Sequence, residues 1–201
     1  MTPIIIGICG PTSTGKTTLA RKATSSFEGM THVPMDDFFK DATDVPMQGD
    51  IPHWNIPESV HLDQLASVLR DLKINVPTEA PMYSKPLSAR VGTQTLHPSP
   101  IIIVEGTLIF SSPEIRGLCS KKIFISTTAD AILALYETRT NDYSTGIRYL
   151  TELVFPTLDD YTARYSQYAD VILDGTQPFE QVTNDLFSHL SNIIAPIHSQ
   201  S

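Results

Sequence analysis

Short apolar runs recur along the chain and predict β-strands. The runs cover residues 3–9, 31–35, 101–104, 122–126 and 170–173, with a weaker strand signal at 91–96. Residues 101–104 are apolar at every position, which is typical of a central parallel strand covered on both faces.

Segments of helical periodicity lie between these runs. They are residues 17–25, the stripe Leu62, Leu65, Leu69 and Leu72 that follows Pro57, and residues 128–140, 147–165 and 179–194. Strands that alternate with helices predict an α/β fold, a three-layer sandwich around a parallel sheet. Ligands of such folds bind at the carboxyl ends of the strands, and the motifs below follow strands.

The length of 201 residues suits one domain with its own core, and we expect a single domain over 1–201. Residues 41–52 are polar and contain Pro and Gly, and residues 73–98 contain four prolines with little periodicity. We expect residues 41–98 to form a flap that shapes a binding pocket. The helical segments at about 128–165 are expected to form a lid.

One motif between the first strand and the first helix carries strong chemical information. Residues 10–17 read Gly-Pro-Thr-Ser-Thr-Gly-Lys-Thr and fit the phosphate-loop pattern G-x-x-x-x-G-K-[ST]. Its backbone N–H groups and the helix N-terminus attract phosphate, its lysine reaches the β- and γ-phosphates, and its final hydroxyl binds Mg²⁺. The predicted ATP-binding residues are Gly10, Thr12, Ser13, Thr14, Gly15, Lys16, Thr17 and Thr18.

Acidic residues follow two other predicted strands. Asp36 and Asp37 come after the second strand, and Glu105 follows the run at 101–104. A carboxylate at such a strand end can orient or deprotonate an acceptor hydroxyl, or hold Mg²⁺. One of the two aspartates suffices for that role, and the other can cap the turn at Phe38 and Phe39.

Composition narrows the partners. The chain has 22 acidic and 14 basic residues, a net charge of -8, and no basic cluster, so nucleic acid and acidic membranes are not expected as partners. It has no apolar run long enough to span a bilayer and no basic segment before its first strand. Its two cysteines, Cys9 and Cys119, do not form a disulfide framework. These features favour a cytoplasmic protein, and they leave open whether it is a monomer or a homo-oligomer.

Four segments together resemble the nicotinamide riboside kinases. They are residues 7–19, Met35-Asp36-Asp37-Phe38-Phe39-Lys40, Ile103-Val104-Glu105-Gly106 and Asp174-Gly175-Thr176. Residues 81–90 and 168–172 also resemble the related uridine kinases. The resemblance implies a P-loop kinase that transfers the γ-phosphoryl group of ATP to the 5′-hydroxyl of a ribonucleoside, with nicotinamide riboside as the first expectation.

The resemblance also implies roles for particular residues. Asp36 matches the base near the acceptor hydroxyl, Glu105 the carboxylate near Mg²⁺, and Arg139 a lid arginine that closes on the phosphates. The neighbouring lid arginines of the family are missing, and Arg148 is a candidate to replace their charge. The predicted catalytic residues are Asp36, Lys16 and Arg139, and the predicted metal ligands are Thr17 and Glu105.

The acceptor side departs from the family pattern. Asn55 stands where the family has an aspartate that holds the ribose hydroxyls, so a charged contact becomes neutral. Ser84 and Ser88 stand where uridine kinases have Asp and His between Tyr83 and Arg90. Trp54 either stacks on a substrate ring or packs onto the following helix. The predicted acceptor-binding residues are Asp36, Trp54, Asn55, Tyr83 and Arg90.

Three other functions fit the same motifs. The acceptor can be uridine or cytidine, or a non-nucleoside alcohol such as pantothenate. The chain can also be a nucleotide-binding module with weakened catalysis. The small number of arginines in the lid supports this alternative. The joint presence of Lys16, Thr17, Asp36 and Glu105 speaks against that last interpretation.

Overall fold

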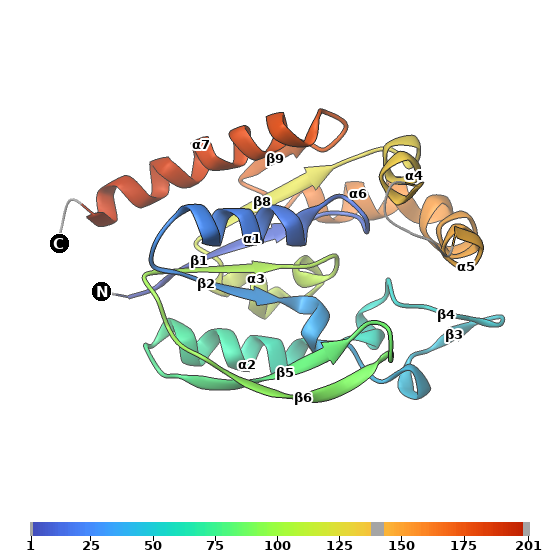
Figure 1. Ribbon diagram of the computed structural model, residues 1–201, viewed down its shortest axis with the longest axis horizontal. Helices are drawn as coiled ribbons and strands as arrows, with labels where there is room; N and C mark the ends of the chain where they lie inside the picture. Colours follow the sequence, from blue (N-terminus) through green and yellow to red (C-terminus); the bar gives the residue numbers. More distant parts are fainter. Residues whose placement is uncertain (1, 138–142, 199–201) are drawn as a thin grey trace.

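A computed structural model describes residues 2–137 and 143–198 of the chain. Its centre is a five-stranded parallel sheet with the strand order β2-β7-β1-β8-β9 (Figure 1). The strands are β1 (Ile4–Cys9), β2 (Met30–Pro34), β7 (Ile101–Glu105), β8 (Lys121–Ser126) and β9 (Val171–Asp174). All five correspond to predicted strands.

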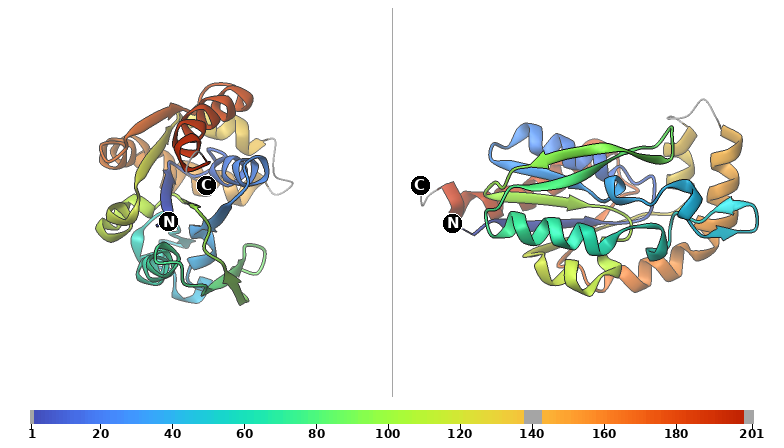
Figure 2. Two further views of the ribbon diagram at one scale, coloured as in Figure 1. Left: turned by 90° about the vertical axis from the view of Figure 1, so that its left-hand side faces the viewer. Right: turned by 90° about the horizontal axis from the view of Figure 1, so that it is seen from below.

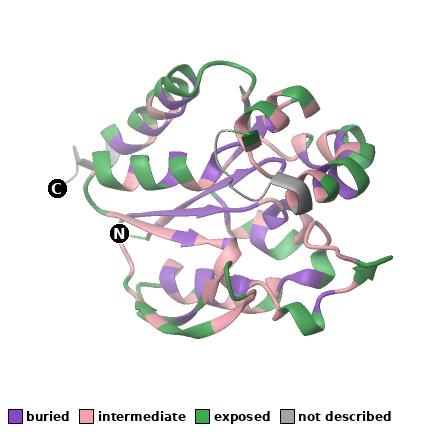
Figure 3. Cartoon of the chain, turned by 45° about the vertical axis from the view of Figure 1, so that its right-hand side comes forward, coloured by how far each residue is buried: buried purple, intermediate pink, exposed green. Residues whose placement is uncertain are grey.

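Helices cover both faces of this sheet, as the predicted three-layer sandwich requires. One face packs on α1 (Lys16–Ser26) and α7 (Phe179–His198), and the other on α2 (Leu62–Lys73), α3 (Pro113–Leu118) and α6 (Leu158–Ser166). Side chains of β1 alternate between the two cores: Ile5 joins the α2 side, and Ile6 joins the α1 side. Figure 3 shows the buried strands between helices whose outer surfaces are exposed.

Residues 128–165, which we expect to form a lid and refer to by that name, contain short helical segments. The segment contains α4 (Ala129–Glu137) and α5 (Tyr143–Tyr149), then the π-helix η5 (Leu150–Val154), the 3₁₀ helix η6 (Phe155–Thr157), and α6. The helical pattern predicted over 147–165 is confirmed, but its α-helical geometry is interrupted between 150 and 157. Pro156 lies at the break, and proline removes an N–H donor and sterically disrupts an α-helix.

Two hairpins lie within residues 41–98. A short one joins β3 (Met47–Gln48) to β4 (Ile51–Pro52), and a long one joins β5 (Thr78–Ser84) to β6 (Ala89–Leu96). The sequence pattern indicated β6 but missed β5, which contains Pro81. The same range includes α2, whose leucines belong to the core rather than to a flap.

Short 3₁₀ helices connect these elements. They are η1 (Met35–Phe38), η2 (Ala42–Asp44), η3 (Pro57–Ser59) and η4 (Ile109–Ser111). The predicted strand at 31–35 therefore ends one residue early, and Met35 begins η1.

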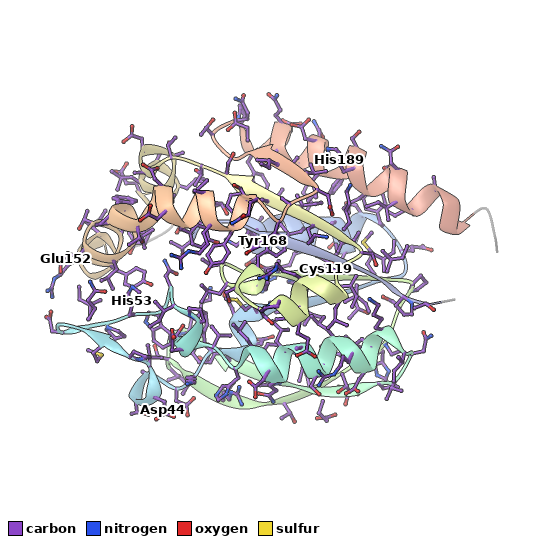
Figure 4. All side chains as sticks on the ribbon, turned by 180° about the vertical axis from the view of Figure 1, so that it is seen from behind. Asp44, His53, Cys119, Glu152, Tyr168 and His189 are labelled. Atoms are coloured by element: carbon purple, nitrogen blue, oxygen red, sulfur yellow. The ribbon has the colours of Figure 1, made fainter. Side chains whose placement is uncertain are left out.

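The hairpins and the lid meet at the carboxyl end of the sheet. Figures 1 and 2 place β3, β4 and α5 at the same end of the molecule, opposite the start of β1. Seen from behind, Asp44 and His53 of residues 41–98 and Glu152 of the lid lie at that end (Figure 4). No helix within 2–137 or 143–198 is both long and apolar enough to cross a bilayer.

Candidate active site

The phosphate loop joins β1 to α1 and needs glycine at two positions. A Cβ on Gly10 would lie 2.6 Å from the carbonyl oxygen of Ile125, so no larger residue fits there. Gly15 has a φ of 84° directly before α1, a left-handed conformation that glycine adopts without strain. The two glycines let the loop turn its backbone toward the N-terminus of α1.

Lys16 begins α1 and is almost fully buried. Its Nζ donates to the carbonyl oxygen of Pro11 at 2.6 Å and to Oγ1 of Thr14 at 3.3 Å. Burial lowers the pKa of the Lys16 ammonium, and the negative charge of Glu105 opposes that shift. The amine is thus fixed inside the site by the loop itself.

Two carboxylates approach the loop from neighbouring strands. Glu105 ends β7 with 2% of its surface exposed, and its Oε1 lies 3.3 Å from Nε2 of His32. Asp36 lies in η1, directly after β2. Because β2 and β7 pair in parallel, with Pro34 opposite Glu105, both carboxylates reach the same edge of the sheet.

These groups line one cavity of about 380 Å³, a size usual for small-molecule sites. It brings together most of the predicted residues: Thr12, Ser13, Gly15, Lys16, Thr17, Thr18, Asp36, Trp54, Asn55, Tyr83 and Glu105. The lining also includes five residues that were not among the predicted site residues: Phe39, Lys85, Ser88, Thr107 and Tyr149. Gly10 and Thr14 shape the phosphate loop without lining the cavity.

Aromatic rings form one wall of this cavity. The Trp54 ring packs edge-on against Phe39 at 5.3 Å between centroids, and Tyr83 lies 5.8 Å from Phe39. The hydroxyls of Tyr83 and Tyr149 are buried at this wall, the first near Ser88 and the second near the backbone of Trp54 and Asn55. Trp54 therefore packs against neighbouring rings and also faces the cavity.

The two adjacent aspartates have different surroundings. Asp36 faces the cavity, and its Oδ2 lies 2.6 Å from Nζ of Lys85. Asp37 points to the long hairpin, where it accepts from the backbone N–H of Tyr83 at 3.3 Å and from the Gln94 side chain at 3.2 Å. Burial raises the pKa of Asp37. Asp37 thus anchors the hairpin to η1 and does not cap the turn at Phe38.

The predicted arginines do not gather at the cavity in the described structure. Arg90 donates through its guanidinium to Gln64 at 2.8 Å and through its backbone N–H to Asp41, and it does not line the cavity. Arg139 lies outside the described residues. Arg148 forms two 2.7 Å hydrogen bonds with Asp50 and so links α5 to the short hairpin.

Lys85 was missed because nothing in the sequence pattern marks it. It stands in a proline-containing segment with little periodicity, on the turn between β5 and β6. Only the folded hairpin carries it to Asp36.

The oxygen donors of the site fit Mg²⁺. The Thr17 hydroxyl and the Glu105 carboxylate are hard ligands that line the same cavity as the phosphate loop. Mg²⁺ in phosphoryl-transfer sites is usually held by one or two such groups together with substrate phosphates. Within the described ranges, no cluster of three or more His, Cys, Asp or Glu residues is placed to hold a metal.

The fold and the loop define a P-loop protein of the α/β class, with phosphate-binding groups and a carboxylate in one cavity. The sequence of residues 5–179 matches the model of the phosphoribulokinase / uridine kinase family. The chain belongs to this family.

Individual relatives agree with this assignment. A uridine kinase of Chlamydia pneumoniae is 32% identical over 96% of this chain and 90% of its own length. A uridine kinase of Bacillus subtilis is 27% identical over 85% of each chain. Among solved structures, a possible uridine kinase from Bacillus stearothermophilus aligns with a TM-score of 0.67 at 18% identity, covering 87% of this chain and 90% of that one. The structural likeness supports the fold.

Proposed function

We propose that this protein is an ATP-dependent kinase that phosphorylates the 5′-hydroxyl of a pyrimidine ribonucleoside, uridine or cytidine. The observation that carries the proposal is the shared cavity of Lys16, Glu105 and Asp36. In this proposal the amine of Lys16 binds phosphate, and the carboxylate of Asp36 accepts the proton of the acceptor hydroxyl. Relatives named uridine kinase and uridine-cytidine kinase support the pyrimidine acceptor. They favour it over nicotinamide riboside, the first expectation from the sequence.

The chemistry needs few groups. The phosphate loop and Lys16 hold the triphosphate of ATP, and Asp36 accepts the proton of the 5′-hydroxyl. The acceptor oxygen then forms a bond to the γ-phosphorus while the bond to the β,γ-bridging oxygen breaks, and ADP leaves with that electron pair. Mg²⁺, held by Thr17 and Glu105, would neutralise charge on the phosphate oxygens. Asp36 releases its proton to solvent afterwards.

The acceptor side is suited to a flat ring and a ribose. Phe39, Trp54 and Tyr83 offer aromatic edges and faces to a base. Asn55 can donate to and accept from ribose hydroxyls, although without the charge of an aspartate. The hydroxyls of Tyr83 and Tyr149, from two residues that line the cavity, are further hydrogen-bonding groups for a ligand. Closure of the lid would exclude water, which otherwise competes as the acceptor.

The test is an acceptor screen that measures ADP release and identifies the product by mass spectrometry. Uridine, cytidine, nicotinamide riboside and pantothenate are each offered with ATP and Mg²⁺, and Lys16→Ala serves as the inactive control. We expect the nucleoside 5′-monophosphate from uridine or cytidine and none from Lys16→Ala. A kcat/KM for nicotinamide riboside or pantothenate above that for uridine and cytidine would refute the proposal of a pyrimidine acceptor. ATP binding without turnover of any acceptor would refute the kinase.

A further inference from the structure

Lys85 lies at the acceptor side of the active-site cavity. It is carried there by the turn between β5 and β6, and its Nζ is 2.6 Å from Oδ2 of Asp36. Among the described residues that line the cavity, Lys16 and Lys85 are the positively charged ones. Lys16 comes from the phosphate loop, and Lys85 comes from the turn between β5 and β6 and pairs with Asp36.

The lysine is held by charge rather than by packing. Its side chain is 71% exposed, and that of Asp36 is 27% exposed. Desolvation disfavours the Lys85 ammonium, but the attraction of Asp36 outweighs it and raises the pKa of Lys85. A flexible four-carbon stem that is not packed can move its charge by a few ångströms.

The reaction geometry brings the phosphoryl group within reach of this amine. A hydroxyl that donates to Asp36 lies about 3 Å from the carboxylate. In a reactive complex the γ-phosphorus lies about 3–3.5 Å from that hydroxyl oxygen. The acceptor hydroxyl also becomes a second hydrogen-bonding partner for Asp36. The amine then has negatively charged phosphoryl oxygens nearby as alternative acceptors.

We propose that Lys85 is a catalytic residue that moves from Asp36 to the oxygens of the transferred phosphoryl group as the acceptor binds. The inference rests on the proposed kinase function. In the empty site Lys85 neutralises Asp36. In the reaction it stabilises negative charge on the phosphoryl group from the side of Asp36, in addition to Lys16. It breaks and forms no covalent bond.

The variants Lys85→Met and Lys85→Arg test this role. Lys85→Met removes the charge and keeps most of the stem, and Lys85→Arg keeps a charge. Leu87→Ala, on the same turn and 70% exposed, controls for disturbance of the hairpin. Lys121→Met, at the start of β8, controls for loss of one positive charge far from the site. Thermal melts confirm that each variant is folded.

Two measurements are made on each variant with the acceptor that the wild-type enzyme uses. The first is steady-state kinetics. The second is the dissociation constant of ADP with and without aluminium fluoride, a mimic of the transferring phosphoryl group, in the presence of acceptor and Mg²⁺. The second measurement separates a contact with the phosphoryl group from a structural effect, because ADP alone has no group at that position.

We expect Lys85→Met to lower kcat by about 10- to 100-fold, less than the about 10²–10³ typical of a buried donor, because water screens this one. It should raise the dissociation constant of ADP with aluminium fluoride by a similar factor. The dissociation constant of ADP without aluminium fluoride should be unchanged. Lys85→Arg should restore most of the kcat and most of the affinity for ADP with aluminium fluoride. Leu87→Ala and Lys121→Met should match the wild type in both measurements. The inference is overturned if Lys85→Met keeps its kcat, or if ADP alone is weakened equally. If the wild-type protein phosphorylates no acceptor, the proposed function fails first and this inference fails with it.

Discussion

Replacing Asp36 by asparagine tests the central assignment of the active site. The amide has nearly the same size as the carboxylate but cannot accept the proton of the acceptor hydroxyl. Loss of a general base costs about 10²–10⁴ in rate, which corresponds to about 2.7–5.4 kcal/mol of activation free energy at about 1.36 kcal/mol per tenfold. We therefore expect kcat to fall by that factor, with the dissociation constant of ATP unchanged.

The same change should cost little stability. Asp36 contributes an ion pair with Lys85 whose lysine is largely exposed, and such pairs contribute up to about 1 kcal/mol. For a protein of this length, about 1 kcal/mol corresponds to a Tm change of about 2–4 °C. A loss of activity in Asp36→Asn with a Tm within that range thus reports chemistry rather than unfolding.

Asp37→Asn is the matched control, because it makes the same chemical change one residue away. The amide oxygen that replaces the carboxylate can still accept from the Tyr83 N–H, and the Gln94 amide can turn to present its oxygen. Burial raises the pKa of Asp37, so the fold disfavours its charge and loses little when the charge is removed. We expect Asp37→Asn to keep the wild-type kcat.

The assay is steady-state ADP release at saturating ATP and acceptor, with ATP binding followed by calorimetry. A near-normal kcat for Asp36→Asn would remove Asp36 from the role of base. An equal loss of kcat in both variants would show that the assignment of different roles to the two aspartates is wrong.

Three further outcomes follow from particular contacts. Asn55→Asp should change acceptor affinity more than ATP affinity in calorimetric titrations, and an unchanged acceptor constant would contradict its place in the pocket. Arg148→Ala removes an exposed pair with Asp50, so we expect a Tm within a few degrees of the wild type. If that pair helps to hold the lid on the short hairpin, the KM for the acceptor should rise, and an unchanged KM would contradict this role. Burial, with Arg90 and Lys40 nearby, lowers the pKa of His61. Its contribution to stability is therefore present above a pH of about 6.5 and lost as the pH falls through the folded-state pKa. His61→Gln should lessen the decline in unfolding free energy from about pH 7 to about pH 5, and an unaltered decline in denaturant titrations would refute this.

The sheet could be predicted from the sequence because each of its strands carries a local apolar signal. Residues 101–104 and the run before Gly10 are continuous apolar segments, and strand–helix alternation implies parallel pairing. The phosphate loop could be predicted because its function needs glycine and lysine at fixed spacing. Local and periodic features of this kind can be recognised from one sequence alone.

The long hairpin of β5 and β6 could not be predicted. The part of the site that this hairpin contributes could not be predicted either. Pro81 and Pro86 suggest a loop, whereas β5 is a strand that pairs with β6 alone and tolerates a proline. The place of Lys85 beside Asp36 depends on the anchoring of that hairpin by Asp37, a contact between residues 46 positions apart. Arg90 was misplaced for a related reason, because the fold turns its guanidinium toward Gln64 on α2. The periodicity of a sequence reports local structure. It does not report which distant residue a side chain contacts in the fold.

The lid has a hydrophobic cluster separate from the two cores of the sheet. Ile132, Leu150, Val154 and Leu158 pack together, with Tyr136 and Phe155 against them. A unit with its own interior can shift as a body, or open locally, without exposing the apolar surface that holds the sheet together. We therefore expect amide hydrogens of 150–158 to exchange with solvent at a lower free energy than those of β1 and β7. Substitutions among these few aliphatic side chains should therefore change the free energy of lid opening while the melting temperature of the sheet and its two cores stays the same.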